Sequence, residues 1–331
     1  MTAVVGDSAR RLPAPFAWFG GKSRCSGLVW RAFGDVRSYV EPFAGSLAVL
    51  LERPPWHRGG SETVNDKDAY ICNFWRAVAA DPDAVARHAD HPVNEVDLLA
   101  RHLWLVNEGR RRIATMESDP EAFDALVAGW WVWGICAWIG SGWCDGTGPW
   151  RAVGGEVVKH LGTPGTGVHR QLPHLGDAGV GVHAPTSAAI RDWMQRLSTR
   201  LRRVRVACGD WQRVTSEAVM RGAGWPCGVL LDPPYGLGNL EYGEGGMGHG
   251  IADEVREWAV ANGDDKRLRI ALCGFEGQHA MPATWRKVAW KSNGGYGSHG
   301  GGESNQHSER IWFSPHCEEP LMRTLFDEPT P

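Results

Sequence analysis

The stretch that most constrains this chain is the apolar run Val229-Leu230-Leu231, which leads directly into Asp232-Pro233-Pro234-Tyr235-Gly236. A short apolar run bounded by turn-forming residues indicates a buried strand. In open α/β sheets, ligands bind outside the carboxyl ends of the strands. The sequence therefore predicts a core strand of an α/β sheet that carries a rigid, polar loop to a ligand-binding edge.

The loop from Asp232 to Tyr235 suits attack by a planar, weakly nucleophilic amine. Hydrogen-bond acceptors around such an NH2 group favour a pyramidal nitrogen with a usable lone pair. The carboxylate of Asp232 is one acceptor, and the carbonyl of Pro233 or Pro234 is a second, because neither proline has an N–H and both have a fixed φ. Tyr235 offers a flat face on which a base can stack. The alternative is an Asp-Pro turn in which Tyr235 only packs.

The composition describes an ordinary soluble protein that is large enough for one big domain or one domain with an insertion. Of its 331 residues, 43% are apolar and 22% are charged, and the net charge is −3. This charge argues against a general polyanion binder, so any contact with nucleic acid must depend on local patches.

Cysteine usage and hydropathy predict the compartment. The eight cysteines form no Cys-x-x-Cys pair, which argues against a zinc site or a disulfide framework and favours reduced thiols. No apolar run reaches the ~18 residues that a membrane span needs, and the amino terminus lacks the apolar region of a signal peptide. We therefore expect a cytoplasmic protein.

An aromatic stretch that contains Trp18 breaks into the turn Gly20-Gly21-Lys22 before an apolar segment at 25–33. The glycines let the backbone approach a ligand, and Lys22 supplies a positive charge. The spacing does not match a phosphate-binding P-loop. The alternative is a surface turn before a helix.

A small-residue turn at 41–46 follows a predicted first strand and precedes an apolar helix. In a doubly wound sheet, such a turn exposes backbone N–H groups to a nucleotide-like ligand. Roughly twenty residues later, Asp66 ends a second strand, at the separation from which a carboxylate reaches ribose hydroxyls. Asp68 could instead cap the helix that begins near Ala69.

The middle of the chain, from about 83 to 204, has a different pattern. Helical segments with many arginines surround a Trp- and Gly-rich centre, and residues 145–187 are expected to form long loops. Six tryptophans within 21 positions favour a small helical core, with base stacking or wedging into a duplex as the alternative. They are Trp130, Trp131, Trp133, Trp138, Trp143 and Trp150.

Two groups of arginines are candidates for contact with phosphates. The run Arg110-Arg111-Arg112 is either a solvated helix face or such a contact. The segment 191–205 carries six arginines opposed only by Asp192, which makes it a candidate phosphate track. The candidates for contact with nucleic-acid phosphates are Arg110, Arg111, Arg112, Arg196, Arg200, Arg202 and Arg203.

A further strand at 204–208 ends in Gly209-Asp210-Trp211. In a nucleoside pocket, Asp210 could bind an adenine amino group and Trp211 could stack on its ring; alternatively, Asp210 caps a helix at 212–221. Later segments predict a helix at 251–261 and strands at 268–274, 285–290 and 309–313. The glycine-rich loops 236–250 and 292–308 are long, and the first suggests a lid or substrate loop.

Taken together, the segments resemble one family, the Dam-like (D12 class) DNA adenine N6-methyltransferases. The resemblance covers roughly 15–80 and 204–314, and the Trp-rich middle is most similar to the phage- and prophage-borne members. The motifs, in order, are Phe19-Gly20-Gly21-Lys22, Glu41-Pro42-Phe43-Ala44-Gly45-Ser46, Asn65-Asp66, Gly209-Asp210-Trp211, Asp232-Pro233-Pro234-Tyr235 and Glu309-Arg310-Ile311-Trp312.

The resemblance implies a doubly wound, Rossmann-like class I methyltransferase sheet with an inserted, mainly helical target-recognition domain. Residues 1–80 and 204–331 would form the catalytic domain, and 81–203 the insertion. The implied reaction moves a methyl group from S-adenosyl-L-methionine to the exocyclic N6 of an adenine flipped out of double-stranded DNA. No metal and no membrane partner is expected, and a cognate restriction endonuclease is a candidate partner.

The resemblance also implies residue roles. Asp232 to Tyr235 would be the catalytic tetrapeptide, Asp66 would bind the cofactor's ribose, Asp210 its adenine, and Lys22 would lie near its methionine end. The cofactor-binding candidates are Trp18, Gly20, Gly21, Lys22, Glu41, Pro42, Phe43, Ala44, Gly45, Ser46, Asp66, Asp210, Trp211 and Asp232.

One departure keeps other functions open. The family's usual second glycine in the cofactor turn is Leu47 here, which restricts how closely the backbone approaches the cofactor. The alternatives are an enzyme that uses the same cofactor with RNA, a protein amide or another transferred group, and a DNA-binding relative without catalysis.

Overall fold

A computed structural model describes most of the chain. Gly20 and Tyr235 lie outside the described residues, as do 236–247 and 292–308 of the two glycine-rich loops. The described residues are 12–16, 18, 21–54, 60–119, 121–138, 143–144, 150–153, 156–159, 186–234, 248–290 and 309–318.

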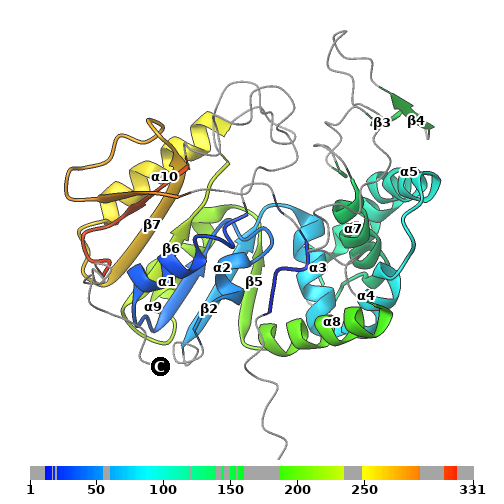
Figure 1. The fold of residues 1–331 in the computed structure, drawn as a ribbon, viewed down its shortest axis with the longest axis horizontal. Helices are drawn as coiled ribbons and strands as arrows, with labels where there is room; N and C mark the ends of the chain where they lie inside the picture. The colour runs from blue at the N-terminus through cyan, green and yellow to red at the C-terminus, as the bar shows by residue number, and fades with distance from the viewer. Residues whose placement is uncertain are drawn as a thin grey trace, which may run out of the picture.

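A seven-stranded sheet forms the centre of the structure, with the strand order β5-β2-β1-β6-β7-β9-β8. Strands β5, β2, β1, β6 and β7 run parallel to one another, and β9 is antiparallel to both β7 and β8. Figure 1 shows this sheet beside a group of helices. The strands are β1 (Ser38–Glu41), β2 (Ser61–Asp66), β5 (Val204–Cys208), β6 (Cys227–Leu231), β7 (Leu268–Phe275), β8 (Arg286–Ala289) and β9 (Glu309–Phe313).

Helices cover both faces of the sheet. Alternate residues of a strand point to opposite faces, so Leu230 packs with α1 (Ser26–Phe33), α2 (Ala48–Leu51) and α3 (Ala69–Ala80), while Leu231 packs with α9 (Glu217–Arg221) and α10 (Gly248–Asn262). All residues of β6 are buried. The prediction of a doubly wound, Rossmann-like sheet is therefore confirmed.

The start of α3 follows a local capping signal, whereas the helix expected at 212–221 does not form as one piece. Asp68 caps α3 by accepting a hydrogen bond from the N–H of Tyr70 (2.8 Å), which was the alternative role for this residue. The helix expected at 212–221 is instead a 3₁₀ turn, η6 (Trp211–Val214), followed by the short helix α9. Ser216 adopts extended backbone angles between them and interrupts the helix.

The middle of the chain forms a helical group next to β5 (Figure 1). Helix α7 packs against α3 and α4, and α8 packs against the same two helices. The elements are α4 (Pro82–Ala89), α5 (Glu95–Trp104), the π-helix η3 (Leu105–Gly109), α6 (Arg110–Ile113), the 3₁₀ helix η4 (Ala114–Glu117), α7 (Ala125–Ala137) and α8 (Ser187–Leu201).

The expectation that 145–187 forms only loops is wrong. Strands β3 (Trp150–Val153) and β4 (Glu156–Lys159) pair antiparallel as a hairpin. The two residues between them are both glycines, and a Gly-Gly pair between extended segments is a hairpin signal that overall glycine content obscures.

The described tryptophans of the middle segment mainly fill the core. Trp131 and Trp133 are fully enclosed, Trp138 and Trp143 are buried, and Trp130 is half-buried. These four buried side chains belong to the same hydrophobic cluster as one face of the sheet. The boundaries of the inserted domain remain a prediction.

Among the described residues, no helix has the length and hydropathy that crossing a bilayer requires. All eight cysteines are free thiols, and seven of them are buried.

Candidate active site

Parallel strands bring the predicted site residues to one edge of the sheet. Strands β1, β2, β5 and β6 end at Glu41, Asp66, Cys208 and Leu231, and parallel strands share their carboxyl edge. Asp210 and Asp232 follow immediately after β5 and β6. The candidate carboxylates, which come from distant parts of the sequence, therefore line a single edge.

Lys22 and Asp232 form an ion pair at this edge. The ammonium Nζ lies 2.9 Å from Oδ2 of Asp232, and the exposed fractions of the two side chains are 5% and 21%. Burial alone would lower the pKa of Lys22, but the carboxylates of Asp232 and Glu309 outweigh it and raise the pKa above its ordinary value. The pair joins two motifs that are 210 positions apart in the sequence, counting from 22 to 232.

The prolines hold the peptide units after Asp232. Pro233 is buried and Pro234 is half-buried. Their nitrogens carry no hydrogen, so this segment presents carbonyl acceptors and a carboxylate without N–H donors between them. Such an arrangement suits a ligand that donates hydrogen bonds.

The turn after β1 is built around Gly45. Its φ is +47°, its N–H donates to Oδ2 of Asp66 (2.9 Å), and its carbonyl accepts from Nε1 of Trp75 (3.2 Å). A Cβ at this position would lie 2.5 Å from Cδ1 of Trp18. The turn therefore requires glycine for its backbone angle and for the space that Trp18 occupies.

Leu47 adopts the backbone conformation that the family's glycine would favour. It has φ 57° and ψ 25°, in the left-handed region, and its side chain is fully buried. A left-handed conformation costs a residue with a Cβ roughly 1–2 kcal/mol. The turn thus keeps its shape without the second glycine, and burial of the leucine side chain offsets the strain.

Asn65 connects three strand ends and was not among the predicted site residues. Its Nδ2 donates to the carbonyls of Pro42 and Gly209, both at 3.0 Å. Its Oδ1 is buried and has no hydrogen-bond partner among the described residues. An asparagine on a buried strand directly before the ribose-binding candidate was the sequence signal for this role.

Asp66 organises backbone groups at the cofactor edge. Besides Gly45, it accepts a hydrogen bond from the N–H of Asp68 (3.0 Å). Burial raises its pKa, and the backbone N–H donors act against that rise. An ionised carboxylate has about four acceptor positions, so these bonds are compatible with a further donor such as a hydroxyl group.

Asp210 and Trp211 form the next part of the edge. Asp210 is exposed and caps η6 by accepting from the N–H of Gln212 (2.8 Å), the alternative role for this residue. Trp211 stacks on Phe43 at 6.2 Å with an interplanar angle of 29°. The buried Nε1 of Trp211 lacks a hydrogen-bond partner within the described part of the chain.

Glu41 is a buried acid at the start of the 41–46 turn. Oε2 accepts a hydrogen bond from the hydroxyl of Tyr39 (2.9 Å). Burial raises the pKa of Glu41 to about 8, with the nearby charges of Asp232 and Asp66 acting in the same direction. Glu41 is therefore largely protonated at neutral pH and adds little negative charge to the edge.

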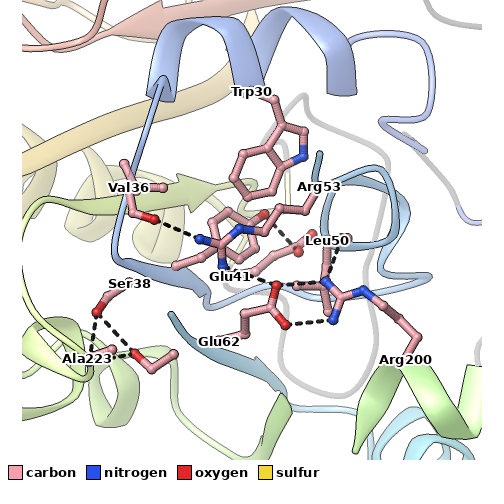
Figure 2. Close-up of polar contacts among 12 residues, drawn as sticks. Trp30, Val36, Ser38, Glu41, Leu50, Arg53, Glu62, Arg200 and Ala223 are labelled. Carbon is pink, nitrogen blue, oxygen red and sulfur yellow. Dashed lines mark hydrogen bonds and ion pairs between the residues drawn. The ribbon is translucent and has the colours of Figure 1, made fainter. Parts of the chain in front are cut away.

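Arg200 is not part of a surface phosphate track. It forms a bidentate ion pair with Glu62, and its exposed fraction is 9%. Arg53 binds the same carboxylate at 3.1 Å, and Figure 2 shows the two guanidinium groups on either side of it. The helix turns this side chain inward, so the structure does not place Arg200 where the predicted DNA contact would need it.

Arg202 and Arg203 are exposed but lie at the other edge of the sheet. They directly precede β5, so they lie where the parallel strands begin, opposite Asp232. Arg196 is half-buried on α8. In Figure 1, α8 runs along the lower side, away from the carboxyl ends of the strands. A duplex that reaches Asp232 would not reach these arginines without wrapping around the sheet.

The three arginines of α6 lie closer to the candidate edge and are exposed. Arg110 donates to the carbonyl of Cys144 (3.2 Å), and its charge acts on Asp68, which follows β2. Arg111 pairs with Glu108 (2.6 Å), and Arg112 with Asp124 (2.6 Å). Of the two predicted arginine groups, this one shares the side of the sheet with Asp232.

The edge fits an adenosine-type cofactor. It combines carboxylates at Asp66 and Asp210, an aromatic face at Trp211, a glycine turn, a buried acceptor at Asn65 Oδ1 and a buried donor at Trp211 Nε1. Buried polar atoms without partners are uncommon in folded proteins, and a ligand with hydroxyl and amino groups would satisfy both.

Comparison with known proteins supports this arrangement. A family model described as D12 class N6 adenine-specific DNA methyltransferase matches residues 18–121. The match contains Lys22, the 41–46 turn and Asp66, and ends before β5 and the Asp232 loop. No curated protein matches the chain.

Proposed function

We propose that this chain, whose residues 18–121 match the model of the D12 class of N6 adenine-specific DNA methyltransferases, is an enzyme that methylates the exocyclic N6 of an adenine flipped out of double-stranded DNA. The methyl donor is S-adenosyl-L-methionine. The observation that carries the proposal is the Lys22–Asp232 ion pair (2.9 Å) beside the glycine turn, because it joins the cofactor edge to the acceptor loop.

The cofactor would be held by the residues at the ends of β1, β2 and β5. Asp66 would bind the ribose hydroxyls, and Asp210 and Trp211 would bind the adenine by a hydrogen bond and by stacking. The 41–46 turn, Trp18 and the Gly20-Gly21-Lys22 segment would enclose the methionine end. When bound, S-adenosyl-L-methionine supplies an electrophilic methyl group.

Asp232 and the proline carbonyls would receive the adenine. Oxygen acceptors around the NH2 hydrogens favour a pyramidal nitrogen whose lone pair points away from them. Asp232 forms an ion pair with Lys22 at 2.9 Å, and an ionised carboxylate is a stronger acceptor than a neutral one. Tyr235 would stack on the base. These residues orient the amine and accept its hydrogen bonds, and none of them forms a covalent bond to the substrate.

We propose that residues 81–203 are the target-recognition domain and that Arg110, Arg111 and Arg112 contact the DNA backbone. Their exposure and their side of the sheet support this role. Asp232 is half-buried, with an exposed fraction of 21%. A base must therefore leave the stack before it can contact this carboxylate. A cognate endonuclease and a phage origin remain predictions.

The test is methyl transfer from labelled cofactor to unmethylated duplex DNA, followed by single-base detection of the modified positions. We expect label in N6-methyladenine at a defined sequence. The Asp232→Asn variant should lose transfer and keep cofactor binding, since it preserves shape and removes the charged acceptor. Label in RNA or in a protein amide, or no label from a folded protein, would reject the proposed acceptor.

A further inference from the structure

The ammonium of Lys22 lies where side chains from four neighbouring strands converge. Strand register and alternation direct four residues to the face that α1 covers: Asp232 just after β6, Cys273 on β7, Glu309 on β9 and Trp290 just after β8. Lys22 lies four positions before α1 begins at Ser26, and its carbonyl accepts a hydrogen bond from the N–H of Ser26 (3.0 Å). The Lys22 environment is thus a property of the whole edge of the sheet.

A second buried carboxylate, that of Glu309, acts on the charge of this ammonium in addition to Asp232. Lys22 and Glu309 are both buried, with an exposed fraction of 5% each. The ammonium is 2.9 Å from Asp232 and 5.5 Å from the ring centroid of Trp290, and the backbone N–H of Trp290 donates to the carbonyl of Glu309 (3.3 Å). Glu309 is thus paired through its backbone with the residue whose ring faces Lys22, and its charge acts on Lys22 from a strand that does not contribute to the acceptor loop.

We propose that Glu309 is a positioning residue, whose carboxylate holds the Lys22 ammonium when Asp232 turns to the amino group of the acceptor. This inference rests on the proposed function. In the structure, Oδ2 of Asp232 binds Lys22, while the acceptor amine requires the same carboxylate. A buried ammonium without a carboxylate partner is strongly destabilised, so a second carboxylate lets Asp232 change partners. Glu309 acts through Lys22 and does not contact the base.

The first arm of the test uses Glu309→Gln, which preserves the shape and removes the charge. Lys22 would then bind Asp232 more tightly, and we expect a ~10- to 100-fold lower kcat with an unchanged KM for the cofactor. Removing a negative charge from beside a carboxylate makes that carboxylate easier to ionise. The acid limb of the kcat–pH profile should therefore move to lower pH, and Glu309→Asp should restore part of the rate.

Glu276→Gln is the matched control. Glu276 also binds cations, Lys287 at 2.6 Å and Arg310, but it is 43% exposed and follows β7 on the solvent side. We expect its kcat and acid limb to match those of the unmodified protein. If Glu309→Gln also leaves both unchanged, or lowers activity only in proportion to folded protein without moving the limb, the positioning role is wrong.

The second arm does not depend on activity. The free energy of unfolding is measured for Lys22→Met, Glu309→Gln and the double variant. If the two side chains interact, the double variant should lose less stability than the sum of the single losses. Additive losses overturn the role of Glu309 whatever the activity. Absence of transfer by the folded unmodified protein overturns the proposed function instead, so the two failures are distinguishable.

Discussion

Arg200 and Glu62 form a buried, bidentate ion pair that fastens the helical segment to the sheet. Nη1 and Nη2 of Arg200 lie 2.6 and 2.7 Å from the two carboxylate oxygens, and Arg53 adds a contact at 3.1 Å. Nη2 of Arg200 also donates to the carbonyl of Leu50 (3.1 Å) (Figure 2). Helix α8, strand β2 and the end of α2 therefore meet at one carboxylate.

Replacing Arg200 should affect stability and leave DNA binding intact. Removing one partner of a buried pair typically lowers the free energy of unfolding by ~3–5 kcal/mol. We expect this loss for Arg200→Gln in urea denaturation, and a change within ~0.5 kcal/mol for the exposed control Arg202→Gln. An Arg200→Gln protein with normal stability and weakened DNA affinity would restore the surface track on α8.

Gly45 should tolerate no side chain. In Gly45→Ala, the backbone angle costs roughly 1–2 kcal/mol, and the new Cβ would lie 2.5 Å from Trp18. We expect lower stability and weaker cofactor binding by calorimetry. Gly27→Ala on α1 is the control, since its Cβ meets only the end of Arg31 at 3.5 Å and a helical alanine gains ~0.5–1 kcal/mol. Equal effects at both positions would contradict this account of the turn.

At position 47, the glycine variant should be more stable than the alanine variant, which reverses the usual order. Leu47→Ala loses a buried side chain, typically ~2–5 kcal/mol, and keeps the left-handed strain. Leu47→Gly loses the same contacts but relieves the strain, so we expect it to be more stable than Leu47→Ala by about 1 kcal/mol. At Leu50, which is equally buried but helical, alanine should be better than glycine by ~0.5–1 kcal/mol. Thermal denaturation of the four variants measures both orders.

Glu41 should make stability depend on pH. Burial raises its pKa in the folded protein from 4.5 to about 8, so the folded state binds the proton more tightly than the unfolded chain does. This contribution is fully present below pH ~4.5 and is lost as the pH rises toward 8, with a slope that approaches ~1.4 kcal/mol per pH unit. The unfolding free energy of the unmodified protein should therefore fall relative to that of Glu41→Gln as the pH rises over this range. A constant difference would contradict the assigned burial effect.

Much of the fold could be predicted from the sequence because its signals are local. The apolar run before Asp232 formed β6, Asp68 capped α3, and the acid-ended strands finished at a common edge. The 3₁₀ turn at Trp211 was missed because it depends on the backbone angles of one or two residues. The pairing of β3 with β4 was missed because the high glycine content of 145–187 favoured loops.

The candidate site was predictable in part. Local motifs identified Lys22, Gly45, Asp66 and Asp232, but not that Lys22 pairs with Asp232. Asn65 was part of a motif but received no site role, because its role depends on the carbonyls of Pro42 and Gly209, which only the assembled sheet brings near. Interactions between distant segments leave no pattern in either segment alone.

By itself, the sequence determined the strands, the turns and the residue types available at each strand end, because apolar periodicity, prolines and glycines act over a few positions. The tertiary structure decided which charged side chains are buried in ion pairs and which are exposed. Helix α8 ends at the edge where the strands begin and turns Arg200 inward. In contrast, Arg110 of α6 acts on Asp68, which follows the carboxyl end of β2. A charged side chain has the same local pattern in both places, and only the packing of the helices against the sheet determines whether it is buried or exposed at the surface.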